Sequence, residues 1–164
     1  MSHPPAQASD GQAVRADRDW LTTAIELSRL CPPSPSAYSV GAVIVAADGV
    51  EIARGYSRQS DPHIHAEEAA LAAIDPTDPR LAGATLYSSL EPCTERRSRP
   101  RTCTQLILGS GLRRVVIAWR EPPLLIADGR GVEVLREAGL TVIEIPDLAA
   151  SAATINAHLA GWTF

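Results

Sequence analysis

The stretch Val40-Gly41-Ala42-Val43-Ile44-Val45-Ala46 decides the first half of the fold, because a continuous apolar run rich in β-branched residues favours a buried strand. It is followed by Asp48-Gly49, a pair typical of a tight hairpin turn. Residues 50–56 then supply the partner strand. We therefore expect an antiparallel pair of strands in the first third of the chain.

Strands and helices alternate along the rest of the chain, which implies parallel pairing of the later strands. The first helix is expected to start at Asp17 and to stop before Pro32. Further helices are expected at 65–74, at 103–108, where Gly109 ends the helix, at 131–137 and at about 147–158. Strands are expected at 85–88, 114–119 and 141–145. The predicted fold class is α/β, a three-layer α/β/α sandwich around a mixed five-stranded sheet.

Composition indicates one domain of an ordinary globular protein, with 164 residues, 45% hydrophobic and 21% charged. Residues 1–16 are rich in Pro, Ala, Ser, Gln and Gly and are predicted to form a disordered leader before a domain at 17–164. No stretch has the pattern of a signal peptide or a membrane span, so we expect a cytoplasmic protein. The net charge of −4 argues against a nucleic-acid partner.

Three polar motifs have the spacing of a catalytic zinc site: His65-Ala66-Glu67, then Glu91-Pro92-Cys93, then Cys103. One imidazole and two thiolates can hold a zinc ion, and three protein ligands leave the fourth tetrahedral position open for water. A carboxylate beside that position can move protons during hydrolysis. We predict His65, Cys93 and Cys103 as metal ligands and Glu67 as the catalytic residue.

These motifs resemble the H-x-E and P-C-x-x-C signature of the cytidine deaminase superfamily, which implies its fold and its zinc cofactor. Nine residues, 94–102, separate the two cysteines here. A long insert at this point is similar to the branch that deaminates the pyrimidine intermediate of riboflavin biosynthesis, the amino-terminal half of a bifunctional deaminase-reductase. That branch typically has eight residues in the gap.

The resemblance continues from about Trp20 to the carboxyl end. Gly129-Arg130-Gly131 and the segment 135–140 are similar to the family's G-K-G and L-x-x-A-G-I segment. The chain resembles a free-standing deaminase half, which implies a homodimer and leaves a reductase of the same pathway to a separate chain. One position departs from the superfamily: Ala37 stands where many members carry an asparagine that contacts ribose, and Asn156 is the chain's sole asparagine.

Substrate contacts are expected from the loop between the cysteines and from one tryptophan. Arginine suits bidentate recognition of phosphate, and a phosphoribosyl group would account for four arginines in six residues, although a solvated loop is the alternative. Trp119 follows a buried strand and either stacks on a heterocycle or packs in the core. His63 is expected to be an exposed loop residue and Glu68 a solvated helix residue. The substrate-binding candidates are Arg96, Arg97, Arg99, Arg101 and Trp119.

The expected function is a zinc-dependent hydrolase that releases ammonia from an aminopyrimidine, foremost the diaminohydroxyphosphoribosylaminopyrimidine-type intermediate that the resemblance implies. A deaminase of free nucleobases or nucleosides, such as cytosine or guanine, is the nearest alternative, and Ala37 favours it. A zinc-stabilised binding module without catalysis is an alternative of another class, against which the presence of Glu67 argues.

Overall fold

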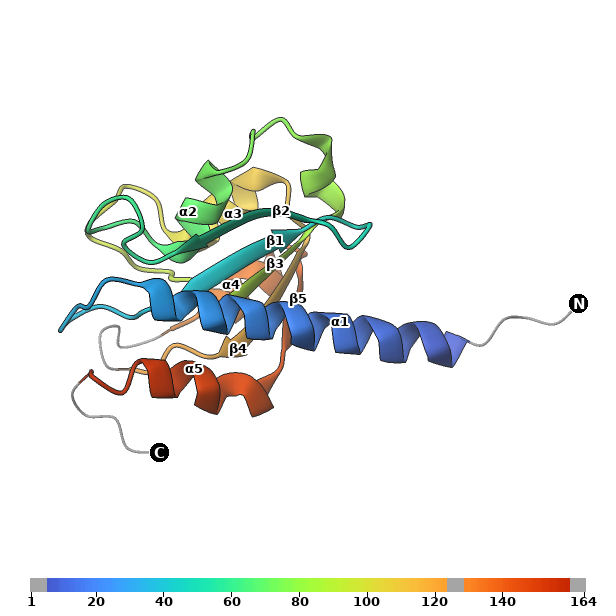
Figure 1. Ribbon diagram of the computed structural model, residues 1–164. Coiled ribbons are helices and arrows are strands. Elements are labelled where there is room, and N and C mark those ends of the chain that lie inside the picture. The colour runs from blue at the N-terminus through green and yellow to red at the C-terminus, as the bar shows by residue number, and fades with distance from the viewer. Residues whose placement is uncertain (1–5, 124–128, 160–164) are drawn as a thin grey trace, which may run out of the picture.

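The computed structural model describes residues 6–123 and 129–159, and it confirms the mixed sheet (Figure 1). The five strands lie in the order β2-β1-β3-β4-β5. Strand β1 pairs antiparallel with both β2 and β3, whereas β3 with β4 and β4 with β5 are parallel. The strands are β1 Gly41–Val45, β2 Glu51–Tyr56, β3 Thr85–Leu90, β4 Arg114–Trp119 and β5 Thr141–Glu144.

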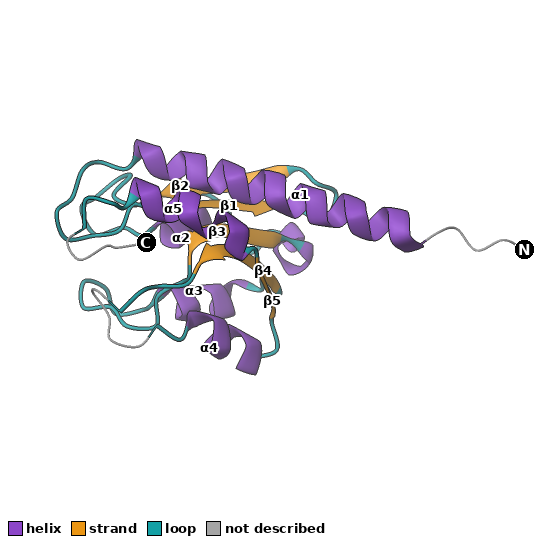
Figure 2. Cartoon of the chain, turned by 90° about the horizontal axis from the view of Figure 1, so that it is seen from below, coloured by secondary structure: helices purple, strands orange, loops and turns teal. Residues whose placement is uncertain are grey.

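Helices cover both faces of the sheet, as the sandwich prediction requires (Figure 2). On one face lie α1 (Ala6–Leu27) and α5 (Ala149–Ile155), which pack against β1, β3 and β4. The layer on the other face consists of α2 (Ala66–Ala72), α3 (Cys103–Ser110) and α4 (Gly131–Glu137). Short 3-10 helices occupy Ser28–Leu30, Pro79–Gly83 and Pro146–Leu148.

The first helix begins earlier than the sequence suggested. It starts at Ala6, so residues 6–16, expected to be a disordered leader, are helical in this structure. Residues 10–16 of this helix are exposed, whereas the side chain of Asp17 is buried. Alanine-rich composition favours this extension, which projects beyond the sheet (Figure 1).

The third helix ends later than expected. It continues through Gly109 to Ser110, and Gly111 closes it in the left-handed conformation with φ of 91°. Gly111 can adopt this backbone conformation without strain because it has no Cβ.

Helices pack closely on the sheet at two glycines of the paired strands. A Cβ on Gly41 would lie 1.9 Å from the carbonyl oxygen of Ala24 in α1. On the other face, a Cβ on Gly55 would lie 2.5 Å from the backbone nitrogen of Ala70 in α2. The second of these contacts brings the α2 helix, and with it His65, onto the sheet.

A buried polar group joins α1 to the sheet. The Asp17 carboxylate accepts hydrogen bonds from Arg114 Nη2 at 2.6 Å and Nη1 at 2.9 Å, and from the Tyr87 hydroxyl at 2.7 Å. Arg114 begins β4 and Tyr87 lies in β3, so this group fixes α1 at the amino ends of two strands. Within the described ranges, no helix has the length and apolar character to cross a bilayer.

Candidate active site

A cavity of about 330 Å³ opens where the parallel strands β3 and β4 end, a usual position for ligand sites in α/β folds. Its volume is in the range of small-molecule sites. The segments that follow β3 and β4 contribute to its wall, together with the loop before β1 and the segment that leads into α2. The residues that line it include Ser36, Ala37, Tyr38, His63, His65, Glu67, Glu91, Cys93, Arg96, Arg97, Ser98 and Glu121.

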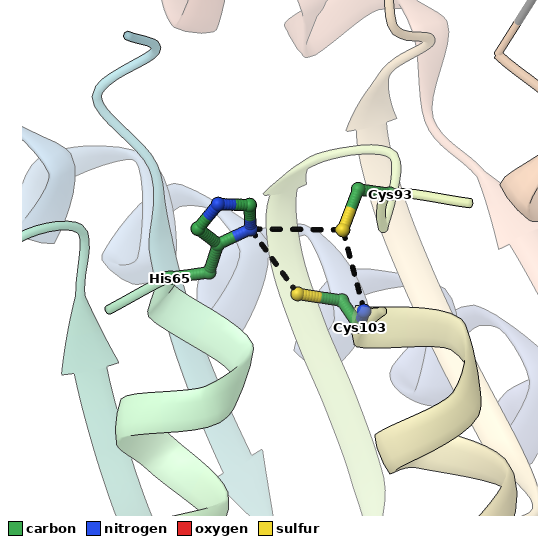
Figure 3. A group of neighbouring side chains, drawn as sticks. All are labelled: His65, Cys93 and Cys103. Atoms are coloured by element: carbon green, nitrogen blue, oxygen red, sulfur yellow. Dashed lines mark hydrogen bonds between the residues drawn. The ribbon is translucent and has the colours of Figure 1, made fainter. Parts of the chain in front are cut away.

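The three predicted metal ligands converge (Figure 3), and two of them, His65 and Cys93, line this cavity. His65 immediately precedes α2, Cys93 follows β3, and Cys103 is the first residue of α3. Their ligand atoms all lie within 4.8 Å of one another. Both helix starts therefore lie where the sequence predicted them, and they bring together residues 38 positions apart.

The distances between these donor atoms fit zinc. His65 Nδ1 lies 3.6 Å from Cys93 Sγ and 3.4 Å from Cys103 Sγ. Zinc bonds of about 2.3 Å to sulfur and about 2.0 Å to nitrogen place the ligand atoms of a tetrahedral site roughly 3.5–3.8 Å apart. One imidazole and two thiols are also a donor set that zinc prefers. The three residues are therefore positioned to bind a metal.

The electrostatics of the ligands favour an ionised thiol. The pKa of Cys93 is lowered to about 4, because Cys103 donates a hydrogen bond to it and His65 stabilises the thiolate further. The backbone N–H of Cys103 also donates to Cys93 Sγ at 3.3 Å. The pKa of His65 is raised: burial alone would lower it, but the hydrogen bond and charge of Cys93 outweigh that effect.

Glu67 lies in the first turn of α2 and is buried, with an exposed fraction of 4%. Its Oε1 accepts a hydrogen bond from Ser88 Oγ in β3 at 2.8 Å. Burial raises the pKa of this carboxyl, and the charge of Cys93 raises it further, against the opposing charge of His65. A buried carboxyl beside the candidate metal ligands is suited to take up a proton and release it again during a reaction.

Two further glutamates shape the site, and one of them was not singled out from the sequence. Glu91 is buried and accepts hydrogen bonds from the backbone N–H groups of Glu121 at 3.0 Å and Val132 at 2.9 Å. It thereby orients the segments after β3 and β4. Glu121 faces the cavity, and burial raises its pKa to about 8, with the charges of Cys93 and Glu91 adding to the shift. Its position after a buried strand was the available sequence signal.

The structure separates the four arginines of the loop between the cysteines. Arg96 and Arg97 line the cavity, whereas Arg99 and Arg101 are not part of its wall. The Arg96 side chain is 2% exposed and pairs with Glu68, while Arg97 is exposed. Arg101 contacts the backbone of Gln105 within its own part of the chain, at 3.5 Å.

Tyr38 forms the aromatic part of the cavity wall, and Trp119 packs against Tyr38. Trp119 is buried and packs edge to face on Tyr38, with ring centroids 5.7 Å apart, and it does not line the cavity itself. Ala37 lies beside Tyr38 in the wall. The buried Asn156 binds the backbone of Ser39 through both ends of its amide, at 2.7 and 3.1 Å, and so anchors this segment to the end of α5. His63 is exposed, as expected, and lies at the rim.

Comparison with known proteins identifies the family. A family model described as the cytidine and deoxycytidylate deaminase zinc-binding region matches residues 14–119. The chain is 39% identical over 129 residues to the diaminohydroxyphosphoribosylamino-pyrimidine deaminase of Schizosaccharomyces pombe, covering 77% of this chain and 31% of that protein. It is 37% identical over 131 residues to riboflavin biosynthesis protein RibD of Aquifex aeolicus, covering 77% and 34%. The chain thus spans about a third of the length of these relatives.

Solved structures of this group share the fold. RibD of Acinetobacter baumannii superposes with a TM-score of 0.75 at 31% identity, over 88% of this chain and 39% of that one. The Rib2 deaminase of Aspergillus oryzae superposes with a TM-score of 0.77 over 88% of this chain and 93% of that one; at 20% identity this likeness concerns the fold alone. The family model covers the three candidate zinc ligands and most of the sheet. The chain therefore belongs to the cytidine and deoxycytidylate deaminase family, and the match is to the zinc-binding region of that family.

Proposed function

We propose that the protein is a zinc-dependent hydrolytic deaminase that releases ammonia from an aminopyrimidine. The proposed substrate is the diaminohydroxyphosphoribosylaminopyrimidine-type intermediate of riboflavin biosynthesis. The single observation that carries the reaction is the buried Glu67 carboxyl in the same cavity as His65 and Cys93. The substrate class is supported by the names of the Schizosaccharomyces pombe and Aquifex aeolicus relatives.

In this proposal, His65, Cys93 and Cys103 hold the metal and Glu67 moves the protons. When bound, zinc supplies Lewis acidity that makes hydroxide available at about neutral pH. Glu67 accepts the proton of the attacking water and passes it to the neighbouring ring nitrogen. Glu67 then takes the proton of the hydroxyl group added to the ring carbon and delivers it to the amino group. The carbon–nitrogen bond breaks, ammonia leaves, and the former hydroxyl oxygen remains as a ring carbonyl. The Ser88 hydroxyl holds the carboxyl in place through its 2.8 Å hydrogen bond.

Phosphate recognition is proposed for Arg97. It lines the cavity, is exposed, and lies on the loop beside Arg96, whose own guanidinium is engaged by Glu68. Ser36 and Ser98 also line the cavity and offer hydroxyl donors to an anion. Arg99 and Arg101 would act on substrate only indirectly, through the loop, and Trp119 through its contact with Tyr38.

Ammonia release from phosphorylated and unphosphorylated substrates tests the proposal. We expect turnover of the phosphoribosylated aminopyrimidine, and a rise in its KM in Arg97→Gln with little change for an unphosphorylated analogue. Arg113→Gln, an exposed arginine at the opposite end of β4, is the matched control. Turnover of free cytosine or guanine alone would instead favour the nucleobase deaminase that Ala37 suggests. A zinc-loaded protein that deaminates none of these compounds would favour a binding module.

Three broader features belong to the same proposal. We expect a homodimer in the cytoplasm, as the family resemblance implies. The net charge of −4 supports a small-molecule substrate rather than a nucleic acid. Light scattering coupled to gel filtration would measure the oligomeric state directly.

A further inference from the structure

Four charged side chains join the loop between the two cysteines to the segment that carries His65. They are Asp61 and Glu68 on one side and Arg96 and Arg99 on the other, and we refer to these four residues as the clamp. Arg96 Nη2 pairs with Glu68 Oε2 at 2.7 Å, and Arg99 Nη2 with Asp61 Oδ2 at 2.5 Å. Arg99 Nε lies 3.4 Å from Glu68 Oε1, which links the two pairs into one group.

Arg96 is the central member of the clamp. In addition to Glu68, its Nη2 donates to the carbonyl oxygen of His63 at 2.5 Å, and its Nε donates to Ser98 Oγ at 3.2 Å. Glu68 in turn accepts from the backbone N–H of His65 at 3.4 Å. The ion pair therefore holds the backbone at His63 and at His65, from a residue only three positions after Cys93.

The cysteine ligands are connected to each other by different bonds. Thr104 donates to the carbonyl oxygen of Cys93 from its backbone N–H at 3.2 Å and from its hydroxyl at 3.1 Å. Those bonds join the two ends of the loop but do not involve His65. The clamp supplies the complementary connection, between the cysteine side of the site and the histidine side.

We propose that the clamp positions the metal centre, with Arg96 and Glu68 as positioning residues that hold His65 at ligand distance from Cys93 and Cys103. Metal affinity depends on such outer contacts because they fix ligand orientation before the ion binds. The proposal also gives the loop arginines Arg96 and Arg99 a role distinct from phosphate binding.

The burial of Arg96 supports a positional role over a gain in stability. Its side chain is 2% exposed, and its Nη1 has no hydrogen-bond partner in the described part of the structure. Withdrawing a guanidinium from water is unfavourable, and a buried ion pair is weak evidence for overall stability. The benefit of this arrangement is that it fixes the segment that carries His65 relative to the loop between the two cysteines.

The experiment measures zinc affinity of the full chain by competition with a chromophoric chelator, so its readout is independent of turnover. We expect Arg96→Met and Glu68→Gln each to weaken zinc binding by about 10- to 100-fold. The double variant should lose little more zinc affinity than the single variant with the larger loss, because both changes break the same contact. Glu68→Gln keeps the shape of the side chain and decides the outcome if Arg96→Met does not fold.

Arg80→Met is the matched control. Arg80 Nη2 and Asp78 Oδ2 are also 2.7 Å apart, but Arg80 is 53% exposed and lies outside the cavity, so zinc affinity should not change. Zinc affinity of the clamp variants equal to that of the control would overturn the clamp. This inference rests on the metal centre of the proposed function, and a parent protein that binds no zinc would overturn that centre itself. Loss of ammonia release at unchanged zinc affinity would overturn the clamp alone.

Discussion

Two arginine–carboxylate groups, each with one buried side chain, lie at opposite ends of the parallel strands, and they differ in what they connect. At the amino ends, Arg114 and Asp17 form two hydrogen bonds, and Tyr87 donates to the same carboxylate. At the carboxyl ends, Arg96 joins Glu68 but leaves Nη1 without a partner among the described residues. The first group joins a helix to strands, and the second joins the loop between the two cysteines to the first turn of α2. Similar ion pairs can therefore serve overall stability at one end and local geometry at the other.

The largest effect on activity is expected from Glu67→Gln, at the end of the strands where the metal ligands lie. An amide keeps the shape of the side chain but cannot carry the proton, so ammonia release should fall by about 10²- to 10⁴-fold. Zinc content and melting temperature should stay close to those of the parent protein. Near-normal turnover in a zinc-loaded Glu67→Gln protein would remove Glu67 from its proposed role.

At the opposite end, Asp17→Asn should act on stability rather than on the reaction. The loss of a buried ionic partner for Arg114 should lower the free energy of unfolding by about 3 kcal/mol at neutral pH. Denaturant unfolding measures this loss. Turnover per folded molecule should not change. A loss of zinc affinity as large in free energy as the loss of stability would contradict the assignment of Asp17 to overall stability and of the clamp to the metal site.

The same variant has a defined pH dependence. Burial raises the pKa of Asp17, but the hydrogen bonds from Arg114 and Tyr87 outweigh it, so the folded pKa is below the ordinary 3.8. A carboxyl with a depressed folded pKa stabilises the protein above its unfolded pKa and loses that contribution as pH falls through the folded value. The stability difference between parent and Asp17→Asn should therefore be constant from neutral pH down to about pH 5 and shrink below about pH 4. A difference that persists at pH 2 would contradict this assignment.

An intermediate effect is expected from Gly131→Ala, where α4 contacts the segment that carries Cys93. A Cβ at this position would lie 2.2 Å from the carbonyl oxygen of Pro92, and backbone atoms cannot move aside as a flexible side chain can. We expect a loss of about 2 kcal/mol in unfolding free energy together with weaker zinc binding. Gly11→Ala, where a Cβ would meet nothing within 4 Å, is the control. Loss of stability at unchanged zinc affinity would show that this contact does not reach Cys93.

The smallest effect should come from removing residues 2–15. Residues 10–16 are exposed, whereas Asp17 is buried. We expect a change below about 0.5 kcal/mol in unfolding free energy, and unchanged zinc binding. We propose that the domain begins at residue 17. A larger loss of unfolding free energy would place the domain boundary earlier in the chain.

Much of the architecture could be predicted from local sequence patterns. The apolar run at 40–46 and the alternation in the second half predicted a mixed sheet, because hydrophobic period and turn residues act over short distances. The grouping of His65, Cys93 and Cys103 could be predicted because imidazole and thiol side chains at this spacing are typical of zinc sites. The late end of α3 was missed because Gly109 and Gly111 both offer a stop signal, and packing selects between them.

The interactions between distant segments could not be predicted in this way. Glu68 was expected to be solvated, yet it is 22% exposed and pairs with Arg96, 28 positions away. The buried carboxylate of Asp17 meets Arg114 across 97 positions. The cavity position of Glu121 depends on Glu91, which holds its backbone. Such pairings follow from the packed topology, which no local pattern encodes.

Asn156 gives the last helix a thermodynamic connection to the cavity. Its amide binds the backbone of Ser39, the neighbour of the cavity residue Tyr38, and also the carbonyl oxygen of Ala152 in α5. Binding free energies are reciprocal, so a ligand that stabilises the segment before β1 also makes local opening of α5 less favourable. Hydrogen exchange of the α5 amides can therefore act as a gauge of cavity occupancy, read on the far side of the sheet from the metal.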